Sequence, residues 1–299
     1  MDEEILNKYR LAGKISAEAK SFGKKLIKPG ASLLDIANRV ESKIIDGGAG
    51  LAFPVNISIN EIAAHYSPTI DDKLKIKKGD VVKLDLGAHI DGYIADTAIT
   101  VEVAENKYTD MIKASSEALD AVIDFIKPGV NLFDIGKIVS EKINSYGFIP
   151  IENLTGHSLR KYTLHAGISV PSVPNNYRNK IPKEGEVLAI EPFATNGAGH
   201  VIQGDGSNIY LCKGSFSPRL VRNRNIKILF NKMKQKFKTL PFSQRNFISE
   251  FPNTDVSLRK LCFLGLIQHY PQLIEADNGI VTQKEHTVIL TDDGCEVTT

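Results

Sequence analysis

Two aspartates, Asp85 and Asp96, stand inside runs of apolar and β-branched residues, where carboxylates are unusual. The dipeptide Asp91-Gly92 between the runs tolerates the positive φ angles of a tight hairpin turn. If its two neighbours bracket a two-residue turn, Asp85 and Asp96 become diagonal neighbours on one face, with Cβ atoms roughly 7–8 Å apart or less. The stretch 81–100 therefore predicts a hairpin that presents two carboxylates together.

The paired carboxylates need an explanation, because an unpaired buried charge costs several kcal/mol. One explanation is that both side chains are partly exposed, or that arginines match them. The other is that they are hard oxygen ligands and that divalent cations cancel their mutual repulsion. The hairpin alone does not decide between these explanations, whereas the rest of the chain favours the metal site.

A helix-turn-helix pattern occurs twice, at one constant offset along the chain. Apolar residues at helical spacing predict a helix over residues 3–28, and Ser32 is suited to cap a second helix. So much identity at a fixed offset indicates a duplicated unit. The matching segments are 27–30 with 126–129, both Ile-Lys-Pro-Gly, and 33–44 with 132–143.

The duplication extends to the acidic residues. Gly-Asp-Val-Val-Lys-Leu-Asp, which ends at Asp85, resembles Gly-Glu-Val-Leu-Ala-Ile-Glu, which ends at Glu191. If a short gap is allowed, Asp96 maps near Glu285 in the second half. Four acidic residues at related positions in two copied halves indicate one site on a pseudo-two-fold axis.

Several histidines could add a nitrogen ligand. His157 follows a predicted strand in the second half; a lone histidine there is more often structural, but converging carboxylates favour a ligand. In a continuous strand His165 would share a face with His157, and His65 has a loosely corresponding place in the first half. His89, His200 and His269 are interpreted as surface or core residues, and His286, next to Glu285, would point away from it in a strand.

An oxygen-rich ligand set with one imidazole suits two divalent ions such as Mn, Fe, Co or Zn, bridged by carboxylates. Two such ions, roughly 3.5–4 Å apart, can activate a bridging water and polarise a carbonyl. The sequence contains no Gly-Lys-Ser/Thr phosphate loop, no Gly-x-Ser-x-Gly elbow and no His-Glu-x-x-His helix. A phosphate-binding or serine-nucleophile function therefore has no support.

Composition bounds the class of protein. The chain has 299 residues, 42% hydrophobic and 24% charged, which is typical of a globular protein with one or two α/β domains. A formal net charge of +2 gives no reason to expect nucleic-acid binding from bulk charge. We expect a cytoplasmic protein outside the membrane, because no apolar run approaches roughly 20 residues, the start is acidic and the three cysteines are widely spaced.

Residues 195–270, between Glu191 and Glu285, are too many for a loop. Helical patterns over 225–237 and 257–267 predict a small helical subdomain inserted into the second half. A solvated helix face explains its basic run, and a ribosome-facing or RNA-facing patch is the alternative. The basic residues are Arg219, Arg222, Arg224, Lys227, Lys232, Lys234, Lys236 and Lys238.

Taken together, the motifs resemble the methionine aminopeptidases of type II, in the short form typical of archaea, over nearly the whole chain. The matching stretches are residues 52–66, 83–98, 156–157, 164–167, 189–193 and 285–287. The resemblance implies an α/β (α+β) pita-bread fold with two pseudo-symmetric halves. Its catalytic domain would comprise residues 1–194 and 271–299, and residues 195–270 would form the inserted helical, winged-helix-like subdomain.

The resemblance also implies an activity, the removal of initiator methionine from methionyl peptides and nascent proteins, in a monomer. Five residues would hold the two metal ions: Asp85, Asp96, His157, Glu191 and Glu285, with Asp96 and Glu285 bridging. Glu191 would move the proton, while His65 and His165 would flank the scissile bond, one at the developing oxyanion and one at the amide. The methionine pocket would include Phe53, Leu164, Phe193 and Tyr270.

Two other readings of the same fold remain. An Xaa-Pro peptidase would share the five ligands, but such enzymes usually carry a large domain before the catalytic one, and Asp85 comes too early for that. A non-enzymatic, ribosome-associated or RNA-associated relative would have lost ligands, whereas every ligand-type residue is present. One departure from the family is Lys284, which replaces an aromatic residue and in a strand would face away from Glu285.

Overall fold

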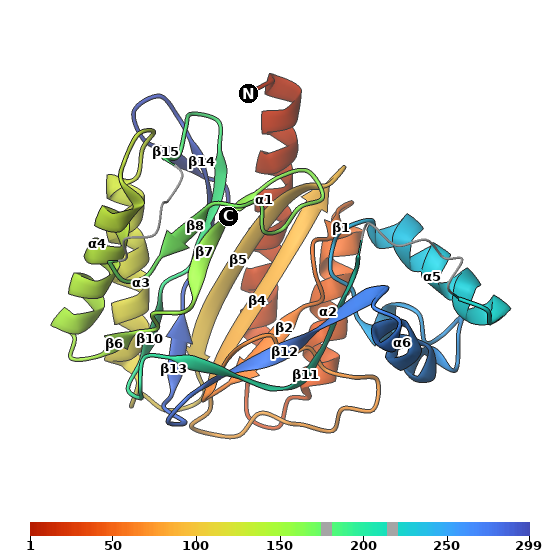
Figure 1. The fold of residues 1–299 in the computed structure, drawn as a ribbon. Coiled ribbons are helices and arrows are strands. Elements are labelled where there is room, and N and C mark those ends of the chain that lie inside the picture. The colour runs from red at the N-terminus through yellow and green to blue at the C-terminus, as the bar shows by residue number, and fades with distance from the viewer. Residues whose placement is uncertain (175–180, 214–220) are drawn as a thin grey trace.

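The structure is a computed structural model that describes residues 1–174, 181–213 and 221–299 (Figure 1). Its helices are α1 (Glu3–Leu26), α2 (Leu33–Asp46), α3 (Thr109–Phe125), α4 (Leu132–Ser145), α5 (Arg224–Phe237), α6 (Thr254–Phe263) and the 3-10 helix η2 (Gln244–Asn246). Its strands are β1 (Gly50–Leu51), β2 (Asn56–Ile59), β3 (Ile62–Ala64), β4 (Val81–Ile90), β5 (Tyr93–Glu102), β6 (Ile149–Pro150), β7 (Thr155–Leu159), β8 (Ser169–Pro171), β9 (Val187–Ile190), β10 (Phe193–Thr195), β11 (Val201–Cys212), β12 (Ile267–Glu275), β13 (Val281–Gln283), β14 (His286–Leu290) and β15 (Cys295–Val297).

The helix pairs α1–α2 and α3–α4 repeat each other. α2 and α4 each have 14 residues, and the glycine of the turn before each, Gly30 or Gly129, has a φ of 83°. That left-handed angle favours glycine, which explains why Ile-Lys-Pro-Gly occurs in both copies. Ser32 and Asn131 cap the second helix of each pair, since their side chains accept backbone N–H groups of its first turn. The predicted duplication is confirmed.

β4 and β5 form the predicted hairpin. Asp91 and Gly92 have φ angles of 52° and 89°, which a type I′ turn requires. The register pairs Gly87 with Asp96, as the two-residue turn predicts. Because side chains alternate along a strand, Asp85 and Asp96 lie on the same face of the hairpin.

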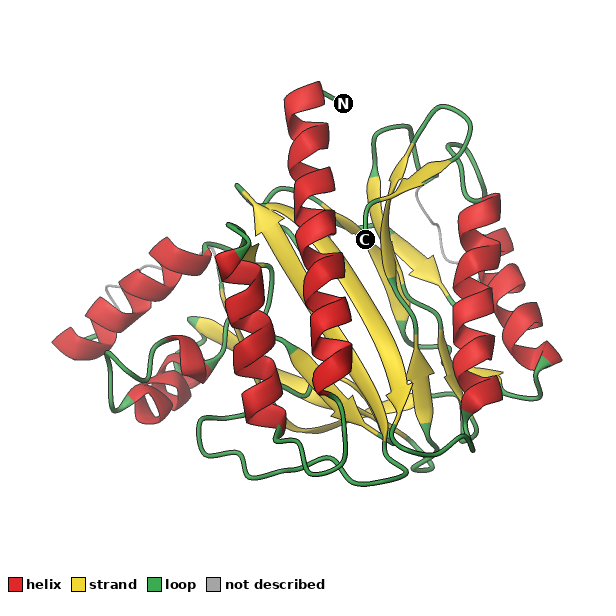
Figure 2. Cartoon of the chain, turned by 180° about the vertical axis from the view of Figure 1, so that it is seen from behind, coloured by secondary structure: helices red, strands yellow, loops and turns green. Residues whose placement is uncertain are grey.

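The four helices of the two halves cover one face of the strands. Seen from behind, α1 to α4 stand in front of the sheet (Figure 2). α1 packs on β4 and β5, whereas α3 packs on β10 and β13. Each half buries its own apolar cluster between helices and strands. The opposite face of the strands is left for the site.

Threonine hydroxyls link the two halves beside the acidic residues. Thr287 Oγ1 accepts the Asp96 N–H at 2.7 Å and donates to Asp96 O at 2.8 Å. Thr97 Oγ1 donates to Glu285 O at 2.8 Å. These buried bonds fix the backbones of Asp96 and Glu285 relative to each other across the pseudo-two-fold axis.

Two predicted elements differ from the structure. The strand expected over residues 51–59 is divided into β1 and β2, because Pro54 has no N–H and the Val55 N–H donates to the side chain of Glu41. The helix expected over 257–267 is α6, which begins earlier and ends at Phe263. Its end follows from Gly265, whose φ of 68° ends a helix.

The range 195–270 holds both helices and strands. α5, η2 and α6 lie within residues 224–263. β11, near the start of the range, pairs with β12, which begins at Ile267 and continues beyond the range to Glu275. Through β12 this ladder also pairs with β3 of the first half. Of the predicted basic run, Arg219 lies outside the described residues. Across residues 1–174, 181–213 and 221–299, no helix is both long and apolar enough to cross a membrane.

Candidate active site

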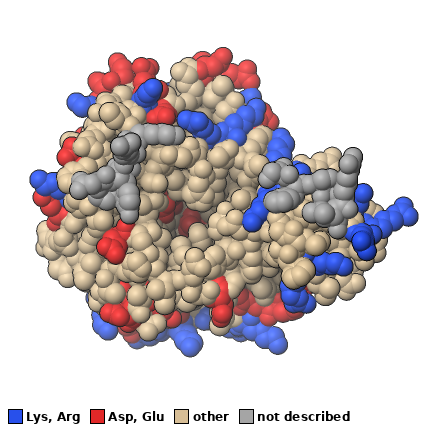
Figure 3. Space-filling view, in the orientation of Figure 1, with Lys and Arg blue, Asp and Glu red and all other residues tan. Residues whose placement is uncertain are grey.

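A pocket on the strand face away from α1 to α4 collects most of the predicted site residues. Figure 3 shows acidic side chains at the bottom of a hollow in the middle of this face. The lining combines carboxylates, imidazoles and apolar side chains. It consists of Phe53, Asn56, Ala64, His65, Asp85, Asp96, His157, Leu164, His165, Glu191, Ile209, Pro241, Tyr270 and Glu285.

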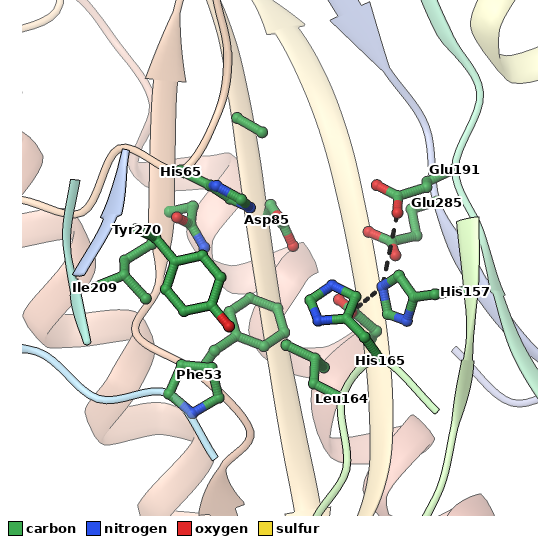
Figure 4. Close-up of a pocket in the computed structure, with 14 residues that line it drawn as sticks. Phe53, His65, Asp85, His157, Leu164, His165, Glu191, Ile209, Tyr270 and Glu285 are labelled. Atoms are coloured by element: carbon green, nitrogen blue, oxygen red, sulfur yellow. Dashed lines mark ion pairs between the residues drawn. The ribbon is translucent and has the colours of Figure 1, made fainter. Parts of the chain in front are cut away.

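Both halves of the molecule contribute to the floor of the pocket. Asp85 and Asp96 come from β4 and β5 and His157 from β7, while Glu191 directly follows β9 and Glu285 directly precedes β14. His157 Nε2 lies 3.7 Å from Asp96 Oδ2 and 3.7 Å from Glu191 Oε1 (Figure 4). One ligand atom each from Asp96, His157 and Glu285 lies within 4.8 Å of the others. The structure brings all five predicted ligand residues together.

Burial raises the pKa of all four carboxyl groups. The pKa of Asp85 rises to about 7, and repulsion from neighbouring carboxylates adds to the effect of burial on the pKa values of Asp96, Glu191 and Glu285. Burial, and then His165, lower the pKa of His157 to about 3, so its imidazole is neutral. Such a set of anions needs either protons or cations to be stable.

The unpaired atoms of this cluster fit a metal site. Asp85 Oδ1 and Asp96 Oδ1 are buried without a hydrogen-bond partner among the described residues. A buried polar atom without a partner costs about 1–3 kcal/mol, so a pair in one place requires a ligand or a function. Carboxylate oxygens with a neutral imidazole are donors that divalent transition metals accept. The residues present therefore fit divalent cations.

Two further histidines stand beside the acidic floor. The ring of His165 lies 4.4 Å from that of His157, measured between centroids. His65 Nδ1 lies 3.3 Å from Pro271 O, and because a carbonyl oxygen can only accept, Nδ1 carries the hydrogen. The Nε2 atom of His65 then keeps its lone pair. Burial lowers the pKa of His65 to about 4, which makes it neutral at neutral pH.

The other histidines do not line the pocket. They have partners of their own elsewhere in the fold, in agreement with the interpretation of His89, His200 and His269 as surface or core residues. These partners are Gly92 for His89, Glu152 for His200, Tyr210 for His269 and Thr299 for His286.

The apolar wall of the pocket includes Phe53, Leu164 and Tyr270, as the sequence predicts. Phe193 is not brought to it, because this side chain packs in a separate core cluster with Ile151 and other residues. The lining residues that sequence reasoning missed are Asn56, Ala64, Ile209 and Pro241. Of these, Asn56 could have been found, because it pairs with Asp85 across β2 and β4.

Comparison with known proteins agrees with this geometry. The family model for metallopeptidase family M24 matches residues 7–220, more than half of the chain. A relative from Methanocaldococcus jannaschii, described as a methionine aminopeptidase, is 46% identical over 299 residues and covers 100% of both chains. The chain belongs to metallopeptidase family M24. Within this family it groups with the methionine aminopeptidases.

Solved structures show the pita-bread fold of the M24 family. A structure of a thermophilic Arx1 superposes with a TM-score of 0.88 at 19% identity and covers 100% of this chain and 91% of its own. A methionine aminopeptidase from Thermotoga maritima gives a TM-score of 0.71 at 22% identity, covering 100% of this chain and 97% of its own. At such low sequence identity these structural similarities are evidence for the fold alone. The predicted pita-bread architecture is confirmed.

The raised carboxyl pKa values predict that the M24 protein without metal loses stability as pH rises. The pKa of Asp85 is 3.8 in a model peptide and about 7 when folded, so between these values the folded state holds more protons than the unfolded state. Its stabilising contribution is complete below about pH 4 and is lost as pH passes about 7. We expect a lower melting temperature for chelator-treated protein at about pH 7.5 than at about pH 5, and recovery at pH 7.5 when divalent metal is added. A melting temperature that rises with pH before metal is added would contradict this.

Proposed function

We propose that this protein removes the initiator methionine from peptides and newly made proteins by metal-dependent hydrolysis of the first peptide bond. The observation that carries the proposal is the meeting of four carboxylates and His157 at the floor of an apolar-walled pocket. A full-length relative described as a methionine aminopeptidase supports the choice of substrate.

The proposed metal site would hold two divalent ions, of Co, Mn, Fe or Zn. When bound, such ions lower the pKa of water and polarise a carbonyl group. The donor set supports this, because carboxylates can each contact two ions and a neutral imidazole suits all four metals. The proposed ligands are Asp85, Asp96, His157, Glu191 and Glu285, with Asp96 and Glu285 shared between the ions.

Glu191 is suited to hold the proton that the attacking water gives up before this proton reaches the leaving amine. Its Oε2 accepts a hydrogen bond from Gln283 Nε2 at 3.2 Å, which leaves Oε1, the atom that faces His157. Burial and the neighbouring Asp85 raise the pKa of Glu191, which favours the protonated form of its carboxyl group. We assign to Oε1 the transfer of this proton to the leaving amine.

The hydrogen bond of His65 separates the roles of the two flanking histidines. With its Nδ1 hydrogen directed to Pro271 O, His65 presents an acceptor, Nε2, which suits the N–H of the scissile amide. The developing oxyanion needs a donor, and we assign that role to His165, next to His157 in the pocket. Both histidines would therefore contact the substrate while staying outside the ligand set.

The substrate side chain would lie against Phe53, Leu164 and Tyr270. An unbranched thioether packs well against such aromatic and aliphatic walls, and its sulfur makes favourable contacts with aromatic rings. The ring of Tyr270 also meets the ring of His65 edge to face, at 5.7 Å between centroids. Binding of methionine and placement of His65 are thus linked through one side chain.

A peptide panel tests the proposed specificity. We expect cleavage of Met-Ala peptides by metal-loaded protein, loss of cleavage in chelator and weak or no cleavage of Xaa-Pro peptides, because the pocket walls suit methionine. Release of free methionine can be followed by chromatography. Preference for Xaa-Pro peptides would replace the proposal by the second M24 activity, a prolidase-type reaction.

The proposal also concerns the domains of the chain, its oligomeric state and its location in the cell. Residues 1–194 and 271–299 would form the catalytic domain, and residues 195–270 an insert that carries the winged-helix-like helices. We infer a monomeric protein in the cytoplasm, and the free thiols of all three cysteines support the cytoplasmic location. The basic side chains of α5, among them Lys227, Lys232 and Lys236, support a transient contact with the ribosome.

A further inference from the structure

A buried ion pair joins the inserted range to the first half of the molecule. Arg245, in η2, contacts the carboxylate of Glu41 on α2, and the two side chains are only 4% and 9% exposed. By contrast, the Lys232–Glu250 pair of the insert is 42% and 51% exposed. Removing two charges from water costs several kcal/mol per ion, and an apolar pair of equal volume is often as stable. Stability alone therefore does not account for the pair.

Arg245 also holds the segment that directly follows His65. Its Nη1 donates to Ser67 Oγ at 3.1 Å and to Pro68 O. Residues of β11 add one hydrogen bond to each of these positions, at 3.1 Å to the Ser67 N–H and at 2.8 Å to Pro68 O. The inserted range thus holds residues 67 and 68 in place through four hydrogen bonds.

The backbone conformation of His65 depends on this support from the neighbouring residues. Its φ of 64° lies in the left-handed region, which is strained for a residue with a side chain. A loose neighbouring segment would allow His65 to relax toward an ordinary backbone angle, and its ring would leave the position that the Pro271 contact defines. The hydrogen bonds to residues 67 and 68 oppose this relaxation.

Glu41, the partner of Arg245, contacts a second segment next to the pocket. It accepts the Val55 N–H at 3.1 Å, in the interval between β1 and β2. Val55 stands between Phe53 and Asn56, which both line the pocket. One buried ion pair therefore reaches two separate segments of the pocket lining, and neither Glu41 nor Arg245 lines the pocket itself.

We propose that Arg245 and Glu41 form a positioning pair through which the inserted range sets His65 and Phe53 for catalysis. The insert is then a working part of the active site, in addition to any contact its outer surface makes. This inference rests on the proposed function for its kinetic test, because His65 is there assigned to the scissile amide. The mobility of residues 65–70 tests it independently of any activity.

The experiment compares Arg245→Met in two backgrounds, wild type and His65→Ala. In wild type we expect a loss of about 10- to 100-fold in kcat/KM on a Met-Ala peptide, since small misplacement of a contacting group costs this much. In the His65→Ala background we expect a clearly smaller further loss, because only the effect that passes through Glu41 to Phe53 remains. Bound metal should not change, and hydrogen exchange over residues 65–70 should become faster.

Controls separate positioning from general damage. Glu250→Gln removes a charge of the exposed insert pair and should change kcat/KM by less than twofold. Arg245→Lys keeps the charge but cannot span the three acceptors, so it should give an intermediate loss and serves if Arg245→Met does not fold. Equal losses in both backgrounds, loss of metal or unchanged exchange over 65–70 would overturn the proposal. Wild-type protein that does not cleave methionyl peptides refutes the proposed function, and the exchange measurement still decides the positioning role.

Discussion

Replacing Glu285 by alanine is expected to abolish peptidase activity while the fold is retained. Glu285 is 1% exposed, and one of its oxygens lies within 4.8 Å of ligand atoms from Asp96 and His157. As a proposed shared ligand it would serve both ions, so its loss removes support from the whole site. We expect metal content to fall together with activity, measured on the same samples by metal analysis and a Met-Ala assay. The same result is expected for Asp96→Ala.

A second prediction for Glu285 concerns the stability of the metal-free protein. Burial and the neighbouring carboxylates raise the pKa of Glu285, so ionised Glu285 destabilises the metal-free fold. Glu285→Gln keeps the volume and removes the charge. We therefore expect a higher melting temperature for this variant than for wild type in chelator at about pH 7.5, and no gain on adding metal. Full activity with unchanged metal content would refute the assignment of Glu285 as a shared ligand.

A second buried glutamate provides the matched control. Glu275 is 0% exposed, and its carboxylate accepts backbone N–H groups from Gly199, Asp277 and Gly279. Glu275→Gln weakens these bonds because an amide cannot accept all of them with both of its atoms. We expect this variant to lose stability at every pH while it keeps its metal, the reverse of the pattern for Glu285→Gln.

Local signals explain how much of the site the sequence predicts. The positions of Asp85 and Asp96 follow from a turn dipeptide and from the alternation of side chains, and both rules act within a few residues. The second half repeats these signals, so Glu191 is found by internal comparison. The turns before β4 and β9 even use the same bond, since Asp80 accepts the Lys77 N–H and Glu186 accepts the Lys183 N–H.

Contacts between distant segments explain what the sequence does not predict. β11 contains Gly204 and Gly206 and lacks an alternating apolar pattern, so only its pairing with β12 makes it a strand. Ile209 and Pro241 line the pocket and come from the inserted range, where no nearby sequence motif indicates a site. Phe193 is the opposite case. It belongs to a predicted motif near Glu191, but its side chain packs in the core. Side-chain direction depends on packing that no local rule contains.

The chemical state of His65 determines how its replacement should act. Burial lowers its pKa to about 4, and its Nδ1 hydrogen is directed to Pro271 O. A neutral ring with a free acceptor atom suits a hydrogen bond from the scissile amide, and it is not needed to hold cations in the proposed ligand set. Its loss should therefore affect the reaction and leave the metal site in place.

We expect His65→Ala to reduce kcat by about 10²-fold, the size typical of losing the placement of a reacting group, with metal content unchanged. Turnover of a Met-Ala peptide and metal analysis on the same preparation measure the two effects. His200→Ala is the control, because His200 is half exposed and contacts Glu152 away from the pocket, and it should leave both quantities unchanged. Metal lost in proportion to activity in His65→Ala would make His65 a ligand, and the role assigned to its Nε2 atom would then be wrong.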